Sequence, residues 1–202
     1  MVVTSTPDRS PSTGLEFRWR SVPSLGSEPL VRVTEMLIEI DQIVRNSLTA
    51  FAADVSASHW SGRREREAVS LYVLRHLAGA VRPESFLHDA AQIGVEVPIP
   101  QLPKESLLHR GGRPKAQVCK DIVLWPKPAM TCWDETGQPT VYPAAVILWK
   151  SNETPDEDDV TWLQEYAMNR IDFVGFAVAT AGYGGSLVVR CARVCSEGVV
   201  RD

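Results

Sequence analysis

The chain has 202 residues, of which 44% are apolar and 23% are charged, and its formal net charge at pH 7 is −4. These values are typical of a globular chain and exclude a collagen-like, coiled-coil or wholly disordered protein. No apolar run approaches the roughly 18 residues that a membrane-spanning helix needs, so no membrane association is expected. The acidic balance argues mildly against a non-specific nucleic-acid coat, which is normally strongly basic.

Residues 1–30 are predicted to form a flexible tail, followed by a single domain over residues 31–202. The start of the chain is rich in Ser, Pro and Thr and lacks the apolar region of a secretory signal peptide. The four cysteines show no CxxC spacing. With no secretory signal, we expect reduced thiols and a cytoplasmic location.

The helical spacing of apolar residues predicts two helices in the first half of the domain, over residues 35–55 and 63–80. The second helix has an apolar stripe at Leu71, Leu74 and Ala78, which Val69, Tyr72 and Val73 broaden. A short helix is predicted over residues 85–92. The remaining expected elements follow in chain order: an edge strand at 93–102, strands at 116–125 and 141–149, a helix from the capping box Thr154-Pro155-Asp156-Glu157, and strands at 173–180 and 187–194.

This order of elements predicts a mixed α/β sandwich of helices and a sheet. A reversal over residues 126–140 joins two strands as a hairpin, and the capped helix serves as a crossover between strands. The run at 141–149 is almost continuously apolar, as in a central strand covered on both faces. We therefore expect a sheet of four or five strands flanked by helices.

Three charged residues stand out in these elements. Asp121 lies in the middle of an apolar strand, where a carboxylate is costly to bury unless it is paired or binds a cation. Lys150 ends the most apolar strand, and Glu67 lies one turn before Leu71, on the stripe that should face the sheet. Each has a simpler explanation, because Asp121 could face solvent or pair with a base, Lys150 could extend into water, and Glu67 could favour the helix dipole.

Together, these residues and the order of elements resemble the PD-(D/E)xK, or restriction-endonuclease-like, nuclease superfamily. The resemblance covers residues 63–194 and rests on the segments Arg64-Glu65-Arg66-Glu67-Ala68-Val69, Lys120-Asp121-Ile122-Val123-Leu124-Trp125 and Ala145-Val146-Ile147-Leu148-Trp149-Lys150. It implies an αβββαβ core and a Mg²⁺- or Mn²⁺-dependent endonuclease acting on DNA phosphodiesters. It also implies that Asp121 is a metal ligand, Lys150 the catalytic lysine and Glu67 the helix acid, which acts in catalysis and metal binding.

One position departs from the family pattern. The motif has an acid two residues before the lysine, on the same strand face, and here that residue is Leu148, which cannot coordinate a hard cation. The second carboxylate could come instead from Glu165 on the crossover helix, as a metal ligand, or from Asp134 or Glu135 in the hairpin. Alternatively, the protein is a catalytically inactive binding or assembly module with the same fold.

The local charge favours a nucleic-acid partner more than the net charge does. Residues 101–130 contain six Lys or Arg against two acids, and Arg63, Arg64 and Arg66 form a second basic cluster. The two clusters could flank one cleft and contact phosphates, or they could be ordinary solvated loops. A third possibility is an unrelated α/β domain with its charged residues on the surface. The oligomeric state stays open, a homodimer included.

Overall fold

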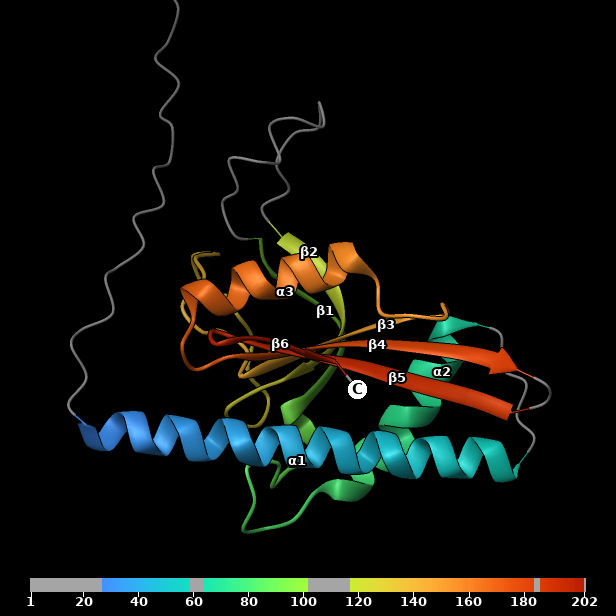
Figure 1. Ribbon diagram of the computed structural model, residues 1–202. Helices are drawn as coiled ribbons and strands as arrows, with labels where there is room; N and C mark the ends of the chain where they lie inside the picture. The colour runs from blue at the N-terminus through green and yellow to red at the C-terminus, as the bar shows by residue number, and fades with distance from the viewer. Residues whose placement is uncertain (1–26, 59–63, 102–116, 184–185, 202) are drawn as a thin grey trace, which may run out of the picture.

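The computed structural model describes residues 27–58, 64–101, 117–183 and 186–201 (Figure 1). The predicted tail therefore lies outside the described residues except for positions 27–30, which belong to the first helix. In the described ranges, no helix combines the length and apolar character needed to cross a membrane. All four cysteines are free thiols, as expected.

The first helix, α1, runs over Ser27–Ala57 and is longer at both ends than the sequence predicts. Its buried apolar residues recur every third or fourth position and so form a single stripe. These residues are Ile40, Val44, Leu48, Phe51 and Val55. The stripe packs α1 along one face of the sheet, as Figure 1 shows.

The second predicted helix forms, but in three successive geometries. It begins as the α-helix α2 over Glu65–Leu71, continues as the π-helix η1 over Tyr72–Leu77, and ends as the 3₁₀ turn η2 over Ala78–Ala80. The predicted apolar stripe is confirmed at Val69, Tyr72 and Val73, which are buried, and wrong at Leu74, which is 75% exposed. Ala68 and Leu77 are buried as well.

The predicted short helix at 85–92 reduces to one 3₁₀ turn, η3 (Ala90–Gln92). Six strands then form a single sheet in the order β1-β2-β3-β4-β5-β6. Their bounds are β1 Ile93–Pro100, β2 Gln117–Leu124, β3 Ala145–Lys150, β4 Val174–Tyr183, β5 Ser186–Cys195 and β6 Gly198–Arg201. The sequence predicts all of these except β6, whose four residues are too few to show a period.

Only β3 and β4 run parallel among the neighbouring strands of this sheet. The helix α3 (Glu157–Asn169) connects them, as the predicted crossover. The predicted capping box is misplaced, since Asp156 is the N-cap residue and accepts hydrogen bonds from the N–H groups of Asp158 and Asp159. The helix thus starts two residues later than expected, which places Asp159 in its first turn.

The sheet lies between two helical layers, with α1 on one side and α3 on the other (Figure 1). Alternate residues of β3 enter the two cores, so Ile147 and Trp149 face α1, whereas Val146 and Leu148 face α3. The protein is therefore a mixed α/β fold with a six-stranded sheet between helices. The continuous apolar run of β3 follows from this burial on both faces.

The contact between α3 and β4 depends on the absence of a side chain at Gly175. A Cβ atom at this position would lie 2.6 Å from Cδ2 and 3.0 Å from Cβ of Leu163. We expect Gly175→Ala to lower the free energy of unfolding by about 1–3 kcal/mol, because the added methyl overpacks this layer. Gly182→Ala is the matched control on the same strand, since a Cβ there meets nothing within 4 Å. Urea denaturation of both variants measures the difference, and an equal loss in both would contradict this packing.

Candidate functional site

The ammonium group of Lys150 lies between carboxylates from the two helical layers. Its Nζ atom is 3.7 Å from Oε1 of Glu65 and 3.8 Å from Oδ2 of Asp159. Glu65 is the first residue of α2, whereas Asp159 lies in the first turn of α3, on the opposite face of the sheet. The lysine therefore joins both layers at the C-terminal end of β3.

Asp121 is held beside this lysine by the backbone of β3. Regular pairing between β2 and β3 ends at Ile122 and Ile147. One residue further, Oδ2 of Asp121 accepts the backbone N–H of Trp149 at 2.7 Å, in the place of a backbone acceptor. The half-buried carboxylate of Asp121 thus faces β3 beside Lys150, and the two predicted residues lie together.

The charges around Lys150 stabilise its protonated form. Burial alone would lower the pKa of this lysine, but the attraction of four carboxylates outweighs burial and raises the pKa above its ordinary value. In order of decreasing effect, these carboxylates are Asp159, Glu65, Asp121 and Asp156. Lys150 is therefore an ammonium ion at neutral pH, and it can donate hydrogen bonds but not accept a proton.

The charged form of Asp159, by contrast, is disfavoured. Burial raises the pKa of its carboxyl group, and the attraction of Lys150 and Lys120 offsets burial only in part. Lys120 is held nearby, with its Nζ atom 3.5 Å from the ring centroid of Trp162, in a cation–π contact. The ionised form of Asp159 is thus under-compensated, and a further cation beside it would be favourable.

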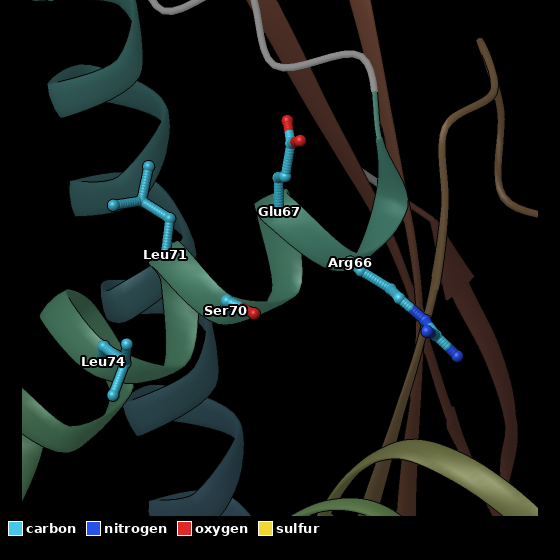
Figure 2. Close-up of a pocket in the computed structure, with 5 residues that line it drawn as sticks. All are labelled: Arg66, Glu67, Ser70, Leu71 and Leu74. Carbon is cyan, nitrogen blue, oxygen red and sulfur yellow. The ribbon is translucent and has the colours of Figure 1, made fainter.

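Glu67 lies elsewhere. Its side chain is 54% exposed, 4.0 Å from the guanidinium of Arg64. It lines an open hollow on α2 and η1 with Arg66, Ser70, Leu71 and Leu74 (Figure 2). The prediction that Glu67 faces the sheet is wrong, because the buried stripe runs through Val69 and Tyr72, and Glu65 is the acid one turn before Val69.

Glu165 is half-buried on α3, six residues after Asp159. This spacing places it about 120° around the helix from Asp159. It is not among the four carboxylates that raise the pKa of Lys150. Asp134, the alternative from the hairpin, accepts hydrogen bonds within its own exposed turn, including the N–H groups of Thr136 and Gln138.

Leu148 is 3% exposed and packs in the core beneath α3. Leu148 therefore lies on the face of the sheet that α3 covers. Asp159 of α3 brings a carboxylate to this face at the end of β3, beside Lys150. Among the described residues, no group of three or more His, Cys, Asp or Glu side chains forms a metal site by itself. Any metal bound here would thus have few protein ligands.

The basic clusters are only partly described. Arg64 and Arg66 are highly exposed, and Arg66 forms an ion pair of 3.0 Å with Glu96 of the edge strand β1. Lys120 lies beside Asp159, as described above. Lys127 is exposed, and the other predicted phosphate contacts, Arg63 and the bases at positions 104, 110, 113 and 115, lie outside the described residues.

The sequence does not predict two acids of the site, Glu65 and Asp159. Asp159 lies three residues before Trp162 and four before Leu163, both buried, so it belongs to the apolar stripe of its helix. A carboxylate on such a stripe indicates a candidate site residue. The acidic run at 156–159 is, however, fully explained by its favourable interaction with the helix dipole, so the sequence does not single out Asp159.

The pKa of Asp159 predicts a cost to stability. A carboxyl group with a raised folded-state pKa destabilises the protein once ionised, so the penalty is absent well below the unfolded pKa of about 3.9 and complete at pH 7. We expect Asp159→Asn to raise the melting temperature by roughly 2 °C at pH 7 and to give no gain at pH 3.

Asp158→Asn is the control, since it removes an exposed acid from the same helical turn. Differential scanning calorimetry at both pH values makes the comparison. A gain of equal size in both variants at pH 7 would show that the effect comes from general helix charge and not from the burial of Asp159.

Comparisons of the chain with protein-family models, with curated proteins and with solved structures found no match.

Proposed function

We propose that the protein is a metal-dependent phosphodiesterase of restriction-endonuclease-like architecture that acts on DNA. The observation that carries this proposal is the convergence of Asp121, Lys150, Glu65 and Asp159 at one end of the sheet. The order α2, β1, β2, β3, α3, β4 also agrees with the αβββαβ core that the resemblance implies.

The charge of the site favours a divalent cation. Four carboxylates and two ammonium groups interact there, which leaves an excess of two negative charges. Mg²⁺ usually keeps several water ligands and needs only one or two protein carboxylates together with substrate phosphate oxygens. Asp159 and Asp121 suit this role, because Asp159 is under-compensated and Asp121 uses Oδ2 for the backbone, which leaves Oδ1 available. When bound, such an ion polarises the phosphodiester and lowers the pKa of a water ligand.

Lys150 supplies positive charge at the phosphate. Because its pKa is raised, the ammonium group donates hydrogen bonds to phosphate oxygens as their negative charge grows in the transition state. Glu65 and Asp159 hold the ammonium in position from two sides, so little reorientation is needed during the reaction. Lys120, with its Nζ atom over the ring of Trp162, is a second cation of the site and of the type that contacts DNA phosphates.

A nicking assay on supercoiled DNA with Mg²⁺ or Mn²⁺ tests this proposal. We expect Asp121→Asn, Asp159→Asn and Lys150→Ala each to lower kcat by about a hundredfold or more, because each removes charge that stabilises the transition state. Activity that survives both Asp121→Asn and Lys150→Ala would remove these residues from the mechanism.

Two glutamates on one helix provide a sharper comparison. Glu65→Gln removes an ion pair with Lys150 and should lower kcat roughly tenfold, whereas Glu67→Gln alters an exposed carboxylate next to Arg64. Nicking rates of the two variants distinguish the acid that pairs with Lys150 from the acid that the sequence predicts. A loss confined to Glu67→Gln would restore the original assignment and contradict the geometry.

The second candidate function is an inactive binding or assembly module. The burial of Leu148 in the position of the motif acid favours it, because a leucine there supplies no oxygen ligand for a metal ion. Isothermal titration with Mn²⁺ separates the two candidates. A binding heat in the wild type that is lost in Asp121→Asn and Asp159→Asn supports the phosphodiesterase, and a lack of heat supports the inactive module.

A further inference from the structure

Thr180 on β4 makes two hydrogen bonds to the strand end that carries Lys150. Its hydroxyl oxygen accepts the indole N–H of Trp149 at 3.1 Å, and the hydroxyl donates to the backbone carbonyl of Lys150 at 3.4 Å. Thr180 is 5% exposed and is one of few buried polar side chains among the described residues. A single hydroxyl thus contacts the side chain of one residue and the main chain of the next.

These bonds complete the attachment of Trp149 and Lys150 from both neighbouring strands. On one side, Asp121 of β2 accepts the backbone N–H of Trp149. On the other side, the pairing of β3 with β4 ends at Lys150 and Ala179, so Thr180 is the next residue of β4. The main chain is therefore held at the N–H of Trp149, one residue before Lys150, and at the carbonyl of Lys150 itself, where the strand leaves the sheet.

The indole that Thr180 binds is itself fixed. The ring of Trp149 is fully buried and packs against Phe51 at 5.4 Å and Tyr72 at 5.2 Å between centroids. The hydroxyl of Tyr72 bonds to that of Ser47 on α1 at 2.7 Å. The hydroxyl of Thr180 therefore connects Lys150 to a rigid part of the core between α1 and η1.

We propose that Thr180 is a positioning residue for Lys150, fixing the direction in which the lysine leaves β3 so that its ammonium stays between Glu65 and Asp159. Thr180 acts through the main chain and touches neither substrate nor metal. The effect on hydrolysis rests on the proposed function, whereas the effect on the ion pairs does not. If Thr180 served only to satisfy the Trp149 indole, its loss would lower stability and leave the ammonium in place.

Competitive labelling with trace acetic anhydride, read by mass spectrometry, tests the proposal on the whole protein without reference to activity. An ammonium held between two carboxylates reacts slowly, and exposed Lys127 serves as the internal reference. We expect Thr180→Val, which keeps the shape but loses both hydrogen bonds, to raise the Lys150 rate relative to Lys127 by roughly three- to tenfold. Thr180→Ser keeps the hydroxyl and should react like the wild type.

Two results would overturn the proposal: an unchanged Lys150 rate in a folded Thr180→Val protein, or a rise of the same size in Thr180→Ser. Thr180→Ala replaces the valine variant if that variant does not fold. In the nicking assay, the valine variant should lose kcat by about tenfold with KM unchanged, and serine should restore it. A wild type without nicking activity would contradict the proposed function while leaving the labelling result to decide the role of Thr180.

Discussion

The hydrogen bond from the backbone N–H of Trp149 to Asp121 is the constraint on which the site depends. It lies where β2 and β3 stop pairing, so without it the backbone N–H of the buried Trp149 would need another partner. The same bond keeps the carboxylate of Asp121 next to the end of β3. In regular strand pairing, a backbone carbonyl would accept this N–H instead. One interaction thus completes the sheet and supplies the acid nearest to the β3 backbone.

The features that the sequence predicts correctly are those that local pattern determines. The apolar run at 141–149 signals a central strand because burial on both faces removes the alternation of polar residues. The hairpin reversal and the crossover helix then place Asp121 and Lys150 on adjacent strands, at the same end of the sheet. Their proximity follows from strand order and antiparallel register, without any knowledge of side-chain packing.

The acids from the helices could not be predicted in the same way. The segment at 65–80 carries apolar residues on two stripes, and only packing against α1 and the sheet selects the one through Val69 and Tyr72. Since this choice decides whether Glu65 or Glu67 faces inward, an error of one stripe moves the site acid by two residues. Asp159 could not be predicted for another reason. A carboxylate in the first turn of a helix interacts favourably with the helix dipole, so its presence there does not indicate a functional role.

The π-helical segment η1 has a consequence for how the protein could change by insertion or deletion. A π-helix closes its hydrogen bonds over one more residue than an α-helix does, and here it separates the turn that carries Glu65 from the 3₁₀ turn that follows Leu77. Loss of a single residue between Tyr72 and Leu77 would restore α-helical geometry and leave the two flanking turns in nearly the same relative orientation, because a π turn holds about one residue more than an α turn. The core residues and the site acid would then keep their faces toward the sheet, so the extra residue of η1 is one that the fold can lose.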